Sequence, residues 1–139
     1  LHGEVVVEDD EIVEALVALV RSWSPDPPPA WVTCVPSLRQ PELVPSLTAR
    51  LAGRLGLPFR PIVQKLRETQ PQSEMDNSTQ QHRNVADAFT VPAPVPEGPV
   101  LLIDDTVDSR WTMTVVTQAL RQAGSGYVFP LVLARAQSD

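Results

Sequence analysis

The run Pro99-Val100-Leu101-Leu102-Ile103 is followed directly by two acids, Asp104 and Asp105. Side chains on a strand alternate between its two faces, and in this run both faces are apolar. Strands of this kind occur in the middle of parallel sheets that helices cover on both sides. We therefore expect residues 99–103 to be the central strand of an α/β domain, with a loop at 104–110 after it.

Helical and extended patterns alternate on both sides of this strand. In chain order we expect a helix over 11–23, a strand over 31–35, a helix over 42–55 ended near Gly56, an extended edge segment over 59–66, a return strand over 85–91, a helix over 111–123 and a strand over 127–133. The apolar stripe of the first helix is expected to be Ile12, Leu16, Leu19, Val20 and Trp23. Strands separated by helices join in parallel, so the fold class is α/β with helices on both faces of a parallel sheet.

Proline divides the 139-residue chain, which contains 15 of them. We expect an N-terminal helical segment over 1–24, a Pro-rich linker over 25–30 and one domain over 31–139. Proline fixes its own φ and biases the preceding residue towards extended backbone, which is why such a run reads as a linker. Residue 1 is Leu rather than Met, which suggests a piece of a longer protein.

The amino-acid composition is that of a globular protein and excludes several other classes of protein. Hydrophobic residues make up 42% and charged residues 20%, which is ordinary globular usage. The single cysteine, Cys34, excludes an internal disulfide framework and a cysteine-clustered zinc site, and a cytoplasmic setting is expected. No apolar run approaches the ~18 residues of a membrane span, so no membrane partner is expected.

The net charge of −6 is unevenly distributed. Residues 1–14 contain six acids and no base, whereas residues 43–67 contain five bases and no acid: Arg50, Arg54, Arg60, Lys65 and Arg67. Clustered bases can attract phosphate or nucleic acid. The alternative, which we favour, is a solvated helix face.

The residues after the central strand carry the chemistry. Ligands of open α/β sheets bind at the carboxyl ends of the strands, where Asp104 and Asp105 lie. The following helix start offers free N–H groups to an anion, and Ser109 and Thr112 add hydroxyl donors. This set suits a ligand with sugar hydroxyls next to a phosphate. Asp and Ser are also common helix caps, which is the purely structural alternative.

The segment Leu101–Thr114 resembles the ribosyl-phosphate motif of type I phosphoribosyltransferases: a strand, two acids, two small or apolar residues, and a Thr/Ser-rich loop that opens a helix. The resemblance implies that Asp104 and Asp105 bind the ribose hydroxyls and that Asp108 is a catalytic base. Ser109 and Thr112 match the hydroxyl positions of the family and would bind the 5-phosphate. Arg110 is not part of the family motif, and its guanidinium either binds the phosphate bidentately or points to solvent. The resemblance also implies Mg²⁺ as cofactor if the domain is catalytic. No metal-ligating residues are expected, because the two histidines, His2 and His82, are too few and too far apart for a histidine-based metal site.

The similarity extends beyond this motif to roughly residues 30–134. The run Val35-Pro36-Ser37-Leu38-Arg39 resembles the pyrophosphate-binding loop, which implies that Ser37 and Arg39 contact pyrophosphate. Residues 67–84 stand where the family has its mobile catalytic flap, and residues 84–89 resemble ComF-type members. The loop residues that the resemblance assigns to this flap are Gln80, Gln81, Arg83 and Asn84.

Two departures from the family are clear in the sequence. Arg110 and Trp111 stand where the phosphate loop has a glycine and a small residue or Lys, and only six residues follow Leu133, too few for a C-terminal hood. The variant string Asp108–Thr114, with Asn77-Ser78-x-Gln80-Gln81 upstream, is most similar to the phosphoribosyltransferase-like domain at the C-terminus of actinobacterial RecQ-type DNA helicases. That resemblance implies helicase domains in the same parent chain as partners. The present sequence has no P-loop, so this chain cannot itself be the ATP-dependent motor.

Three functions remain open at this point. The first is a binding module for a ribose-phosphate or nucleotide-type ligand, with nucleic acid as a further partner. The second is a Mg-dependent phosphoribosyltransferase that uses phosphoribosyl pyrophosphate and a nucleobase. The third is a degenerate scaffold that contacts DNA or protein. The missing glycine and hood disfavour the second, and the retained acids disfavour the third.

Overall fold

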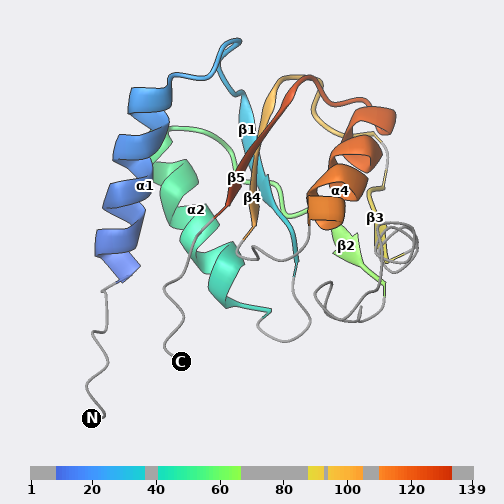
Figure 1. Cartoon of the computed structure of the whole chain (residues 1–139), viewed down its shortest axis with the longest axis horizontal. Helices are drawn as coiled ribbons and strands as arrows, with labels where there is room; N and C mark the ends of the chain where they lie inside the picture. The colour runs from blue at the N-terminus through green and yellow to red at the C-terminus, as the bar shows by residue number, and fades with distance from the viewer. Residues whose placement is uncertain (1–8, 37–40, 67–87, 93, 105–109, 133–139) are drawn as a thin grey trace.

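The computed structural model describes residues 9–36, 41–66, 88–92, 94–104 and 110–132. Its elements are α1 (Asp9–Trp23), β1 (Trp31–Cys34), α2 (Leu43–Leu55), β2 (Gln64–Lys65), β3 (Phe89–Thr90), β4 (Val100–Asp104), α4 (Arg110–Gln122) and β5 (Val128–Val132). Figure 1 shows three layers: α1 and α2 on one side, the sheet of β1, β4 and β5 in the middle, and α4 with β2 and β3 on the other. Among the described residues, every helix is too short or too polar to span a bilayer.

The central position expected for residues 99–103 is confirmed. The sheet has the order β1-β4-β5, and both pairings are parallel. Val100 lies opposite Trp31 on one side and Val128 on the other. All five residues of β4 are buried, including Asp104, which the sequence pattern had assigned to the following loop. The strand has the expected length but is shifted by one residue, from 99–103 to 100–104, and the Asp104 backbone pairs with Val132.

The two faces of the sheet belong to two separate cores. On the α1 and α2 side the buried sheet residues are Val32, Cys34, Leu101, Ile103 and Leu131. On the α4 side they are Trp31, Val35, Val100 and Leu102, packed against Val115, Val116 and Leu120 of α4 and against Phe89 of β3. This strict alternation follows from the two-residue period of a strand. It also shows which layer each strand residue faces.

Strand β5 is the edge of this sheet, and Pro130 lies in its middle. Pro130 is opposite Leu102, and the neighbouring residues supply the hydrogen bonds to β4; Val100 N, for example, donates to Tyr127 O at 2.8 Å. Proline has no N–H, so it fits where the backbone nitrogen points away from the partner strand. The position also leaves the outer edge with one donor fewer for pairing with another chain.

The apolar stripe expected for α1 is partly wrong. The structure buries Val13, Leu16, Val17 and Val20, whereas Leu19 is 50% and Trp23 41% exposed. Both sets of residues have helical spacing, so the 3.6-residue period alone does not choose between them. Helix α1 packs on α2 as well as on the sheet, and the two-sided contact selects the face centred on Val17. Trp23 instead meets the Phe129 ring edge-on, with a centroid distance of 5.7 Å.

The segment 59–66 does not form one edge strand. Phe59 makes a single parallel bridge to Val32, with Val32 N donating to Pro58 O and Arg60 N donating to Val32 O, both at 2.9 Å. The next donor along the segment, Ile62 N, donates to Arg60 O at 2.9 Å instead of to β1, so the pairing ends there. The chain then pairs Gln64–Lys65 antiparallel with Phe89–Thr90, which forms a separate two-stranded sheet. Of the return strand expected over 85–91, residues 85–87 lie outside the described part of the chain.

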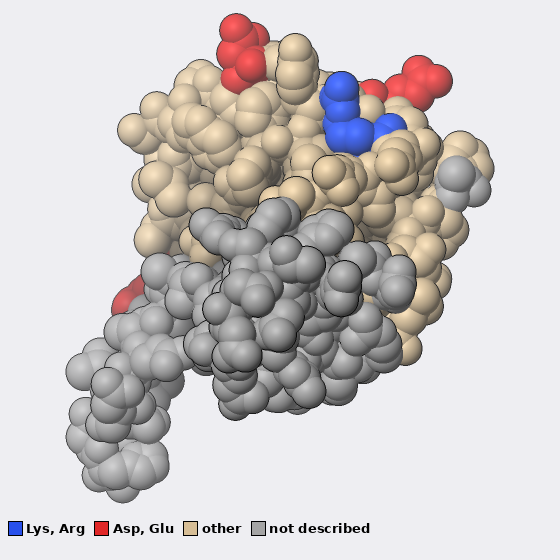
Figure 2. Space-filling view, turned by 45° about the vertical axis from the view of Figure 1, so that its right-hand side comes forward, with Lys and Arg blue, Asp and Glu red and all other residues tan. Residues whose placement is uncertain are grey.

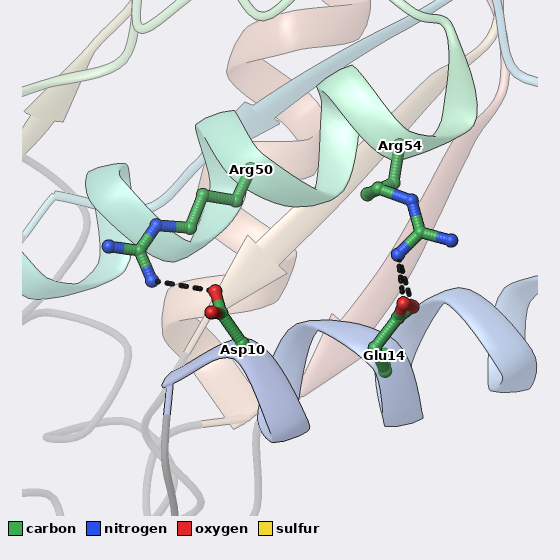
Figure 3. A network of polar contacts seen from close by, with 4 residues as sticks. All are labelled: Asp10, Glu14, Arg50 and Arg54. Carbon is green, nitrogen blue, oxygen red and sulfur yellow. Dashed lines mark hydrogen bonds and ion pairs between the residues drawn. The ribbon is translucent and has the colours of Figure 1, made fainter.

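Two of the bases between residues 43 and 67 pair with acids of the first helix. Arg50 of α2 lies 3.5 Å from Asp10 of α1, and Arg54 Nη1 contacts both carboxylate oxygens of Glu14 (Figure 3). Asp10 and Glu14 are one helical turn apart on α1, and their partners are one turn apart on α2. The two ion pairs therefore lie in a row along the α1–α2 contact. The acidic first helix therefore neutralises part of the basic second one.

Candidate functional site

The carboxyl ends of the three parallel strands meet at one edge of the sheet, at the lower side of Figure 1. Asp104 is the last residue of the central strand and is only 2% exposed. On the β1 side, Val35 N donates to Ile103 O at 2.8 Å, which extends the pairing up to the level of Asp104. Asp104 therefore lies at the edge where ligands of open α/β sheets bind, between two neighbouring strands.

The side chain of Asp104 belongs to the α4 side of the sheet. It follows Val100 and Leu102 at two-residue spacing, and both of those residues contribute to the core under α4. A carboxylate removed from water is costly unless polar or charged groups compensate it. Strand formation by itself does not require an acid at this position.

Helix α4 begins at Arg110, six positions after Asp104, and it carries Thr112 in its first turn. Thr112 is 6% exposed, so its hydroxyl lies inside the molecule rather than in solvent. The first N–H groups of a helix have no partner within the helix, and the positive end of its dipole favours an anion. The fold thus places Asp104 and the α4 N-terminus on the same side of the sheet, at its carboxyl edge.

Most of the other predicted site residues lie outside the described residues. This is so for Asp105, Asp108 and Ser109, for Ser37 and Arg39, and for Gln80, Gln81, Arg83 and Asn84. The backbone of Arg110 starts α4, but its side chain is outside the described part as well. Two of these segments, 37–40 and 105–109, follow directly after Pro36 and Asp104. Pro36 and Asp104 lie at the carboxyl edge of the adjacent strands β1 and β4.

Buried polar side chains identify one residue that sequence reasoning missed. Among the described residues the buried polar side chains are Thr33, Thr48, Asp104, Thr112 and Ser125. Thr48 donates to Val44 O within α2 at 2.7 Å, and Ser125 donates to Gly126 O in the loop before β5 at 3.0 Å, so both hydroxyls have local partners. Thr33 Oγ1, in contrast, has no hydrogen-bond partner in the described structure. Threonine is common in strands, so nothing in the run Trp31–Val35 distinguished Thr33 as a candidate site residue.

Charge on the α4 side is sparse where it can be seen. In Figure 2 the coloured acidic and basic side chains stand at the margins of the described surface, which shows no broad basic patch on this side. No group of three or more His, Cys, Asp or Glu residues that could hold a metal ion occurs within the described ranges.

Comparison with known proteins adds one finding. No protein-family model matches the sequence, and no curated protein matches it. Among solved structures, the chain is similar to one described as the allosteric regulatory enzyme of purine biosynthesis, with a TM-score of 0.59 and 19% sequence identity. The match covers 91% of this chain and 25% of that chain, so the present sequence spans a quarter of the other protein.

This likeness concerns the fold. Together with the parallel sheet and the helices on its two faces, it confirms the expected α/β fold of the type I phosphoribosyltransferase kind. The similarity extends over nearly the whole chain. The expected division at residues 25–30 stays a prediction, although α1 shares a core with α2, β1 and β4.

Proposed function

We propose that this chain is a phosphoribosyltransferase-like module that binds a ribose-phosphate or nucleotide-type ligand at the segment Asp104–Thr112. The observation that supports it best is the burial of Asp104 at the carboxyl end of the central strand. A carboxylate there accepts hydrogen bonds from sugar hydroxyls, while the N-terminus of α4 receives a phosphate. In this proposal Asp105, Ser109 and Arg110 complete the site.

The proposal also covers the parent protein to which this module belongs. The string Asp108–Thr114 supports a domain of a RecQ-type DNA helicase, with the ATP-dependent motor domains of the same parent chain as its partners. Ligand binding by such a module would then regulate or localise the helicase. Catalysis, with Asp108 as base and Mg²⁺ bound with the pyrophosphate, is the alternative that the experiment below tests in parallel.

The test is calorimetric titration of the intact chain with ribose 5-phosphate, phosphoribosyl pyrophosphate with and without Mg²⁺, inorganic phosphate and single-stranded DNA. We expect the sugar phosphates to bind more tightly than inorganic phosphate. In Asp104→Asn this preference should fall about tenfold, since a charge-assisted hydrogen bond contributes ~1.5–3 kcal/mol. Asp10→Asn, at a carboxylate on α1 that is 92% exposed, is the matched control and should leave binding unchanged.

Other outcomes assign the chain differently. Equal affinity for ribose 5-phosphate and inorganic phosphate in the wild type would remove the ribose site from the proposal. Binding of single-stranded DNA alone would support the scaffold function. Release of pyrophosphate from phosphoribosyl pyrophosphate with a nucleobase and Mg²⁺, lost in Asp108→Asn, would show the enzyme.

A further inference from the structure

Within the described part of the chain, the hydroxyl of Thr33 is buried without a hydrogen-bond partner, on the face of the sheet that carries Asp104. Thr33 is 0% exposed, and it alternates with Val32 and Cys34, which face α1 and α2. Its neighbours at two-residue spacing, Trp31 and Val35, belong to the core under α4. Thr33 therefore points to the α4 side, as Asp104 does.

The sheet register places the two residues close together. Thr33 lies opposite Leu102, and Asp104 is the next residue of β4 on the same face. Asp104 is therefore one diagonal step from Thr33, towards the carboxyl edge of the sheet. Diagonal neighbours on one sheet face are within reach of a single small polar group that bridges them.

A buried hydroxyl without a partner is an unusual choice for stability. Valine has nearly the same shape, suits a strand equally well and carries no polar atom. The two buried hydroxyls of Thr48 and Ser125, away from this edge, both have partners. Thr33 differs from them in facing the side of the sheet on which the proposed ligand site lies.

We propose that Thr33 is a positioning residue of the ligand site. Its hydroxyl gains its hydrogen bond when a sugar-phosphate ligand engages Asp104, and it then helps to hold that carboxylate towards the sugar hydroxyls. The inference rests on the proposed function and extends it from β4 to the adjacent strand β1. It also assigns Thr33 to the recognition of the sugar rather than of the phosphate.

The experiment compares Thr33→Val with Thr33→Ser and with the control Thr48→Val, in titrations with ribose 5-phosphate and inorganic phosphate. Thr33→Val should weaken binding of ribose 5-phosphate about three- to tenfold, leave inorganic phosphate unaffected, and raise the Tm of the ligand-free protein by about 3–6 °C. Thr33→Ser retains the hydroxyl and should retain the binding. Thr48→Val removes a satisfied hydroxyl, so it should not raise the Tm or change binding.

A double-mutant cycle tests whether Thr33 acts through Asp104. In an Asp104→Asn background, Thr33→Val should have no further effect on ribose 5-phosphate binding. An undiminished effect there would overturn the positioning role, and so would a Thr33→Val protein that binds ribose 5-phosphate as tightly as the wild type. In both cases the proposed function stands. If the wild type does not bind ribose 5-phosphate at all, the proposed function itself fails and the role of Thr33 fails with it.

Discussion

Gly126 lies at the most crowded backbone crossing among the glycines that the structure describes. Its N–H donates to Gly98 O at 3.1 Å, and the same oxygen accepts a hydrogen bond from the Trp31 indole at 2.9 Å. A Cβ on Gly126 would lie 2.9 Å from Gly98 C and from Pro99 N. Backbone atoms cannot move aside as a flexible side chain can, so this position requires glycine because of the close approach.

At the residue scale we therefore predict that Gly126→Ala lowers the free energy of unfolding by about 1–3 kcal/mol, as overpacked sites do. Gly53 is the matched control because it lies in α2 with no atom within 4 Å of an added Cβ. Gly53→Ala should raise the free energy of unfolding by about 0.5–1 kcal/mol through helix propensity and reduced unfolded-state entropy. Urea denaturation measures the free energy of unfolding of both variants. A change of the same sign in Gly126→Ala and Gly53→Ala would show that the backbone crossing does not require glycine at position 126.

At the scale of elements, α1 is held by two kinds of contact. Its buried side chains Val13, Leu16, Val17 and Val20 enter the core shared with α2 and the sheet. Its ion pairs lie at the rim, where the side chains of Arg54 and Glu14 are 46% and 56% exposed. Exposed pairs contribute little because water and salt screen them. The apolar contact therefore dominates the attachment of this helix.

The corresponding prediction compares Val17→Ala with Glu14→Gln. Val17 is 2% exposed, so losing two buried carbons should reduce the free energy of unfolding by about 2 kcal/mol, at low and at high salt alike. Glu14→Gln should reduce it by less than about 1 kcal/mol, and this difference should shrink in 1 M NaCl. Thermal and urea unfolding at two salt concentrations provide the measurement. A larger loss for Glu14→Gln than for Val17→Ala would show that the ion pairs hold α1.

At the scale of the whole molecule, the first helix covers one face of the sheet. The four buried residues of α1 represent about 6–12 kcal/mol of apolar burial, which is comparable to the entire stability of an ordinary domain. Val32, Leu101 and Ile103 of the sheet belong to the same core. The Pro-rich segment after Trp23 thus connects two parts that share a hydrophobic core.

We predict that deletion of residues 1–24 abolishes cooperative thermal unfolding of the remaining chain. Deletion of residues 1–8 alone retains α1 (Asp9–Trp23) and is the control. Circular dichroism gives the transition, and binding of a hydrophobic dye reports the uncovered face of the sheet. A cooperative transition in the chain of residues 25–139, at the midpoint of the control, would instead show an independent domain of the kind that the proline pattern predicts.

Several elements could be predicted from the sequence because their signals are local. The apolar run at 99–103 identified β4 as the central strand, since both of its faces needed cover. The leucine spacing of α2 and its end at Gly56 were equally clear, and Gly56 has the left-handed φ of 72° that favours glycine. The same run predicted that Asp104 lies at the carboxyl edge of the sheet, although it placed Asp104 in the following loop and not in β4 itself.

Other features of the fold were decided by tertiary contacts, because the local sequence is compatible with more than one arrangement of each. Helical spacing allowed two faces of α1, and the position of α2 selected the one centred on Val17. The pairing of Gln64–Lys65 with Phe89–Thr90 joins segments more than 20 residues apart, so no neighbouring residue encodes it. Thr33 is an ordinary strand residue in the sequence, and it is the packing of α4 over β1 and β4 that leaves its hydroxyl without a hydrogen-bond partner among the described residues. Burial depends on what lies across the sheet, and the residues that cover a given side chain are distant in the chain.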